Sequence, residues 1–156
     1  MMLKKSSQGD SLRFIKDYSI PKNLHWAKPV PAFAKGLAAE EQLLKEIEAT
    51  EIPKESATLF KSFVNNWQGK DMPLGKVWLN EQLSHLTVSE RPIAQLMFLA
   101  AFAPYSVTEK DIINFLKIKP ADKELITFCY WAIQTLTNRI SGWLTQSFNN
   151  RKEIRV

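Results

Sequence analysis

The chain has 156 residues, a length that suits one ordinary domain able to bury a sizeable core. Hydrophobic residues make up 45% and charged residues 24%, which is typical of globular proteins and excludes a disordered or fibrous chain. The net charge of +5 would suit a nucleic-acid or acidic-membrane partner only if it were concentrated on one surface, whereas basic residues load both ends and the middle is mixed. Solvated tails are therefore the favoured interpretation of the charge.

The cysteine and hydropathy patterns indicate a soluble, cytoplasmic protein. Cys129 is the single cysteine and has no partner for an intramolecular disulfide, and no Cys or His spacing typical of zinc or of a redox pair occurs. We expect no metal and no cofactor. Polar residues follow Lys4 and Lys5 where a signal peptide would be apolar. The longest strongly apolar run, residues 93–104, is far shorter than the roughly 20 residues of a membrane span.

Residues 1–33 are predicted to form an irregular N-terminal arm. Pro21, Pro29 and Pro31 oppose a regular helix and favour an extended path. Apolar residues such as Trp26 also occur there at irregular spacing. They would suit an arm strapped across its own domain or across a partner subunit, or they are incidental residues of a loose tail.

Helices are predicted for the rest of the chain, because glycine is scarce and hairpin signals are missing. Residues 34–49 are rich in helix formers and carry an apolar stripe at helical spacing. A second helix should begin at Pro53 and end before Gly69, and a third should run from Val77 to about His85.

Two helix starts carry the Ser/Thr-x-x-Glu spacing of a capping box, Thr87 with Glu90 and Ser106 with Glu109. The helix after the first, residues 91–103, is apolar on nearly every face and should lie in the centre of the domain. The second box should open a short helix.

A long last helix should follow Pro120, with an apolar stripe from Leu125 to Leu144. The predicted fold class is therefore all-α: a single-domain bundle of about six helices over residues 34–150, preceded by the arm.

No catalytic residue is predicted, but four residues are candidates for a pocket or interface. His85 would complement a helix dipole, or would act as a base only if the fold brought a nucleophile to it. Asn138 and Arg139 interrupt the last helix beside its apolar stripe, where the guanidinium would bind a carboxylate, cross a subunit boundary or hold an anionic ligand. Trp131 would line a pocket or pack in the core.

From Glu90 onward the chain resembles the alkylhydroperoxidase D-like and carboxymuconolactone decarboxylase-like superfamily, in two alternative registers. The first matches the stretch ERPIAQLMFLAAFAPYSVTEKD to the family's buried helix and Cys-x-x-Cys-x-x-x-His motif, so that Ala103, Ser106 and Lys110 stand at the positions of the two thiols and the histidine. The second, which we prefer because it explains Asn138 and Arg139, matches the peroxidase-related branch through Glu90, Arg91, Val107, Thr108, Asp111, Asp122, Glu124, Ile126, Asn138, Arg139 and Leu144.

The resemblance implies an alkylhydroperoxidase D-like helical fold and a homo-oligomer. The family's peroxide chemistry needs one thiolate to attack the peroxide and a second thiol to resolve the sulfenate. Cys129 matches neither thiol position in either register. We therefore expect a non-peroxidatic protein, more a binding protein than an enzyme.

Two functions follow as hypotheses. The first is a homo-oligomer that binds a small molecule near residues 93–102 or acts as an oligomeric interaction protein. The alternative is a basic helical adaptor that binds nucleic acid or a protein partner through its charged ends or its arm. No membrane partner is expected.

Overall fold

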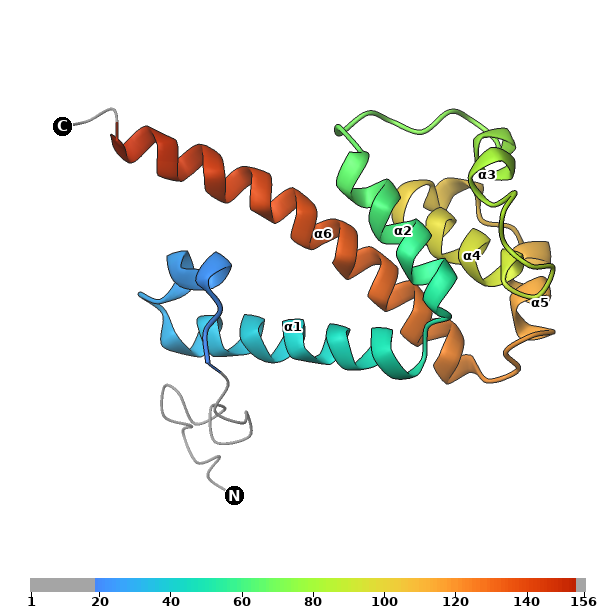
Figure 1. Cartoon of the computed structure of the whole chain (residues 1–156), viewed down its shortest axis with the longest axis horizontal. Coiled ribbons are helices and arrows are strands. Elements are labelled where there is room, and N and C mark those ends of the chain that lie inside the picture. The colour runs from blue at the N-terminus through green and yellow to red at the C-terminus, as the bar shows by residue number, and fades with distance from the viewer. Residues whose placement is uncertain (1–18, 154–156) are drawn as a thin grey trace, which may run out of the picture. The chain divides into compact units, whose positions relative to one another are not determined.

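The computed structural model describes the backbone of residues 19–153 and most side chains of residues 19–145 (Figure 1). Within this range the chain contains six α-helices and two short 3-10 helices and no strand, which confirms the predicted all-α class. None of the described helices is long and apolar enough to cross a membrane. The basic residues before residue 19, including Lys4 and Lys5, lie outside the described residues.

The elements follow one another in the expected order. Their bounds are η2 (Lys22–Ala27), α1 (Pro31–Thr50), α2 (Lys54–Asn66), α3 (Val77–Gln82), α4 (Arg91–Phe102), η3 (Pro104–Ser106), α5 (Glu109–Leu116) and α6 (Asp122–Glu153).

Two stretches are more helical than the sequence indicated. Residues 22–27 of the predicted irregular arm form a 3-10 helix, and α1 begins at Pro31 rather than at residue 34. A proline suits the first helical position because its ring fixes a helical φ and the missing N–H has no intrahelical partner there. The amide N–H of Ala34 donates to the carbonyl of Val30, 3.0 Å away, and closes the first turn.

The chain divides into two compact units, one ending at Lys45 and the other beginning at Glu46, so that the division falls inside α1. In the first unit, Trp26 and Phe33 contact each other edge to face, with ring centroids 5.9 Å apart. The division into an arm of residues 1–33 and a domain of residues 34–150 stays a prediction.

The second unit is built around α4, which contacts α2, α5 and α6 (Figure 1). Ile93, Leu96 and Met97 are buried, as are Phe98 and Leu99, so the helix lies in the centre of its unit as predicted. Burying a side chain of this size contributes about 1.5–3 kcal/mol relative to leaving it in water.

Aromatic rings connect α4 with α2 and α6. Phe98 meets Phe60 of α2 edge to face, with centroids 5.0 Å apart, and Phe60 lies 5.5 Å from Trp131 of α6. Further along, Trp67 stacks on Trp143 at 5.5 Å. These contacts place Trp131 in the core, one of the two positions that the sequence analysis left open for it.

The predicted start of α5 was wrong. The capping box is formed by Thr108 and Asp111, not by Ser106 and Glu109. Ser106 closes the 3-10 turn η3, whereas Thr108 has the extended backbone, φ −121° and ψ 160°, that a residue before a helix requires.

The predicted pair of Thr87 and Glu90 forms both hydrogen bonds of a capping box, in the turn before α4. The hydroxyl of Thr87 accepts from the N–H of Glu90 at 3.3 Å, and the carboxylate of Glu90 accepts from the N–H of Thr87 at 3.3 Å and from its hydroxyl at 2.7 Å. The helix α3 ends at Gln82, three residues before His85, because Leu83 leaves the helical conformation at φ −90° and ψ 2°.

Candidate functional site

The four residues predicted for a pocket or interface have different surroundings. His85 is exposed in the turn after α3, and Asn138 is exposed on α6. Trp131 is 1% exposed and packs in the core against Phe60. Within the described part of the chain, no hydrogen bond, ion pair or ring contact joins any two of these four side chains. Asn138 and Arg139 are neighbours in sequence.

Arg139 finds the acceptor that its place beside the core requires, although that acceptor is not a carboxylate. One terminal nitrogen donates to the backbone carbonyl of Asn65 at 3.1 Å, which joins α6 to the last turn of α2. The guanidinium also lies 5.0 Å from the centroid of the Trp143 ring, a favourable cation–π distance. Its Nε is buried without a hydrogen-bond partner.

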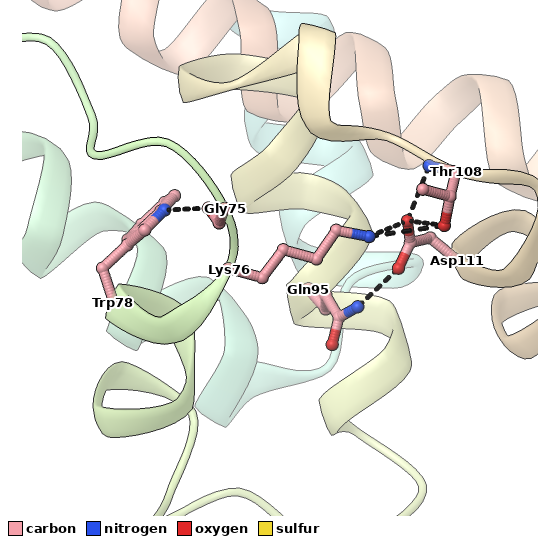
Figure 2. Close-up of polar contacts among 6 residues, drawn as sticks. All are labelled: Gly75, Lys76, Trp78, Gln95, Thr108 and Asp111. Carbon is pink, nitrogen blue, oxygen red and sulfur yellow. Dashed lines mark hydrogen bonds and ion pairs between the residues drawn. The ribbon is translucent and has the colours of Figure 1, made fainter.

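The buried carboxylate of Asp111, which is 5% exposed, lies within a cluster of four polar side chains (Figure 2). Its other members are Lys76, which immediately precedes α3, Gln95 of α4, and Thr108, which caps α5. We call these residues the Asp111 cluster. The cluster connects the start of α3, the interior of α4 and the start of α5 within the second unit.

Every partner of the carboxylate is a donor. The amide of Gln95 donates to Oδ1 at 2.6 Å. The other oxygen, Oδ2, accepts from the backbone N–H of Thr108 at 2.7 Å and from its hydroxyl at 2.6 Å, and it forms an ion pair with Lys76. Lys76 also contacts the Thr108 hydroxyl at 3.3 Å.

Local sequence explains how Lys76 reaches this position. Gly75 has a φ of +87°, a backbone conformation that residues other than glycine adopt only at an energetic cost. This conformation turns the chain into α3. Its carbonyl accepts from the indole N–H of Trp78 at 3.1 Å, which holds the turn against the helix (Figure 2).

The electrostatics of the Asp111 cluster favour an ionised carboxylate. Burial by itself would raise the pKa of Asp111, but the hydrogen bonds from Lys76, Thr108 and Gln95 outweigh it and leave the pKa below its usual value. A carboxylate of low pKa whose oxygens already accept four donors is a weak proton acceptor. The arrangement therefore holds the α3 start against α4 and α5, and it does not resemble a general base.

The sequence analysis did not identify the Asp111 cluster. Thr108 and Asp111 entered only through the family resemblance, and Lys76 and Gln95 were not singled out. The signal for half of the cluster was present, because Thr-x-x-Asp has the spacing of a capping box with aspartate in place of glutamate.

The described part of the chain does not supply the pair of thiols that the family's peroxide chemistry needs. Cys129 is half-buried on α6, and burial raises the pKa of its thiol, which disfavours the reactive thiolate. At the α4–α5 corner, where the first register places the family's motif, Ala103 is buried and Ser106 and Lys110 supply a hydroxyl and an ammonium. No group of three or more His, Cys, Asp or Glu side chains among the described residues could hold a metal ion.

No family model matches the chain, and no solved structure matches it. It is similar to the alkyl hydroperoxide reductase Rv2159c of Mycobacterium tuberculosis, with 28% identity over 136 residues, or 87% of this chain. The similarity confirms the predicted resemblance to the alkylhydroperoxidase D-like superfamily. The chain spans 39% of the length of that relative, so the activity in the relative's name does not transfer directly.

Proposed function

We infer that this chain is a non-peroxidatic relative of the alkylhydroperoxidase D-like proteins that acts as a homo-oligomeric interaction protein. The observation that carries the non-peroxidatic part of this proposal is the state of Cys129, whereas the homo-oligomeric part follows from the family resemblance. Cys129 is the single cysteine of these 156 residues, its thiol has a raised pKa, and they contain no second thiol to resolve a sulfenate.

The environment of α4 does not favour a small-molecule pocket. An apolar pocket was predicted near residues 93–102, where Ile93, Met97, Phe98 and Leu99 are at most 2% exposed. Their surfaces are covered by side chains of the same unit, among them Phe60. Binding of a small molecule therefore ranks second within this proposal, and a cytoplasmic location remains part of it.

The decisive experiment measures peroxide consumption by the wild-type chain and by Cys129→Ser, with hydrogen peroxide and an organic hydroperoxide and with dithiothreitol as reductant. We expect both proteins to consume peroxide at the rate of the buffer with reductant alone. Catalytic turnover that is lost in Cys129→Ser would overturn the proposal, because it would show that the lone thiol is peroxidatic.

The alternative, a basic adaptor for nucleic acid, has less support from the described charges. Four lysines, Lys45, Lys61, Lys76 and Lys119, are engaged in ion pairs with carboxylates of the same chain. Binding to a fluorescent duplex, measured at about 50 and about 200 mM salt, tests it. Affinity that falls steeply over this range would support phosphate contacts and favour the adaptor.

A further inference from the structure

The helix α6 carries a stripe of apolar side chains on the face that points away from its core contacts. Ile126 is 64% exposed, Ile133 44%, Ile140 37% and Leu144 58%. Together with Tyr130 and Thr137 they recur at alternating spacings of four and three residues. We call these six residues the α6 seam.

The spacing of the α6 seam is that of a coiled coil. A 4-3 repeat of apolar residues forms a narrow stripe along one helix, which packs against a similar stripe on a second helix. At 100° per residue, the six positions fall within about 40° on either side of one line along α6. The buried residues Phe128, Trp131 and Ala132 lie on other faces of the helix.

The surroundings of the seam suit burial. A helix surface that stays in water normally carries charged residues, but α6 has none between Leu125 and Asn138. The polar seam residue Thr137 donates its hydroxyl to the carbonyl of Ile133 at 2.8 Å, so that this hydroxyl needs no water partner. Burial of the seam would therefore leave no charged group and no hydroxyl of Thr137 without a partner.

We propose that the α6 seam binds the same seam of a second copy of this chain, with the two helices antiparallel. This inference rests on the proposed function and names the partner and the surface. Antiparallel coiled-coil pairing sets each Ile of the seam against Leu144, Tyr130 or Thr137 of the other copy. The layers are Ile126 with Leu144, Ile140 with Tyr130, and Ile133 with Thr137, each formed twice.

The order of residues in the α6 seam suits a second copy in the antiparallel orientation. A parallel pair would instead face Thr137 with Thr137 and Tyr130 with Tyr130, and so would place two polar layers in the centre of the interface. The antiparallel pair gives every layer at least one isoleucine. It also places each helix N-terminus near the C-terminus of its partner helix, the favourable arrangement of their dipoles.

The size of the seam sets the expected affinity. The four large aliphatic side chains expose on the order of 400 Å² of apolar surface, about half of the roughly 800 Å² per partner that a standard interface buries. An interface of this size belongs to the weak, reversible class, because association must also offset the lost freedom of the subunits.

Sedimentation equilibrium of the complete chain tests the proposal. We expect a reversible monomer–dimer equilibrium in the wild type. The variant Ile133→Glu should weaken the dimer at least tenfold, because a carboxylate in the central layers must lose its hydration without gaining a partner. Asn138→Glu, on the same helix but about 100° or more from the seam line, is the matched control and should leave the dimer within twofold of wild type.

Either of two results would overturn the surface assignment: a wild-type chain that is monomeric at about 100 µM, or a dimer that Ile133→Glu and Asn138→Glu weaken equally. Far-UV circular dichroism checks that each variant is folded. Should Ile133→Glu fail this check, Leu144→Glu at the outer layer replaces it and should weaken the dimer more than Asn138→Glu does.

Cys129 gives a one-sided check on the orientation of the two helices, in which only rapid cross-linking is decisive. In the antiparallel pair centred between Ile133 and Thr137, the two copies of Cys129 lie twelve residues apart along the axis, roughly 18 Å. Disulfides require Cα atoms within about 7 Å. Mild oxidation should therefore leave the chain without a cross-linked dimer on a non-reducing gel, whereas rapid cross-linking in proportion to the dimer would overturn the antiparallel pairing.

The failures of the two proposals can be told apart. Thiol-dependent peroxide turnover would overturn the non-peroxidatic function and leave the sedimentation results unchanged. A dimer that Ile133→Glu does not weaken would overturn the α6 seam alone, whereas a strictly monomeric chain would overturn both the seam and the homo-oligomeric part of the proposed function.

Discussion

Replacing Asp111 with asparagine should destabilise the second unit by about 3 kcal/mol at pH 7. The substitution keeps the shape of the side chain but removes its charge and turns one acceptor oxygen into a donor. Because the N–H and hydroxyl of Thr108, the amide of Gln95 and the ammonium of Lys76 all donate to Asp111, one side of the new amide must face donors.

The magnitude follows from the separate contacts. Loss of the capping interaction with Thr108 should cost about 1 kcal/mol. Loss of a charged acceptor for the amide of Gln95 should cost about 1.5 kcal/mol. Because the side chain of Lys76 is 31% exposed, the ion pair is partly screened by water and adds at most about 1 kcal/mol.

The pH dependence has a definite sign. The pKa of Asp111 is lowered in the folded chain, so its charge stabilises the fold above the unfolded pKa of about 3.9, and this contribution is lost as the pH falls through the folded pKa. The difference between wild type and Asp111→Asn should therefore be constant from pH 7 to pH 5 and shrink below about pH 4.

Urea unfolding followed by tryptophan fluorescence at pH 7, 5 and 3 measures this difference. Asp71→Asn, in an exposed loop, is the matched control and should change the free energy of unfolding by no more than about 0.5 kcal/mol. The reasoning is refuted if Asp111→Asn matches that control at pH 7, or if its deficit is as large at pH 3 as at pH 7.

Three further predictions concern individual positions. Thr108→Ala should destabilise the chain by about 1 kcal/mol in the same assay, whereas Ser106→Ala should cost less than about 0.5 kcal/mol, since only Thr108 caps α5. Gly69→Ala should cost about 1 kcal/mol because Gly69 has a φ of +78°; a neutral result would contradict the left-handed conformation. Cys129 should react with Ellman's reagent more slowly at pH 8 than free cysteine does and reach that rate after unfolding, and equal rates in the native chain would contradict its raised pKa.

The sequence predicted the helices well because their apolar patterns are strong and local. The residues of α4 are apolar on nearly every face, and only a central position satisfies such a helix. Pro31 shows the limit of this reasoning. Three prolines in one segment indicated an irregular path, yet Pro31 occupies the first turn of α1, where proline is favoured.

The Asp111 cluster could not be predicted from local patterns alone. Lys76 and Asp111 are 35 residues apart, and their contact depends on how α3, α4 and α5 pack. The α6 seam is the opposite case, because its 4-3 spacing can be read in the sequence. The sequence analysis identified one apolar stripe on that helix, but periodicity shows that a face is apolar and not which of two apolar faces the domain buries.

Arg139 offers a final test that separates a structural role from an anion site. Arg139→Met should destabilise the chain by about 1 kcal/mol, since methionine packs on Trp143 but neither donates to Asn65 nor makes a cation–π contact. Arg139→Lys should recover less than half of this loss, because an ammonium lacks the planar guanidinium that stacks on the ring while a terminal nitrogen reaches Asn65.

Urea unfolding with and without about 50 mM phosphate distinguishes the two roles. We expect phosphate to shift the wild type and Arg139→Met equally, because the guanidinium contacts Asn65 and Trp143 and its unpartnered Nε is buried. Selective stabilisation of the wild type, together with full recovery by Arg139→Lys, would instead show that a positive charge at this position binds an anion. The contacts that Arg139 makes with Asn65 and Trp143 would then be those of an anion site without its ligand.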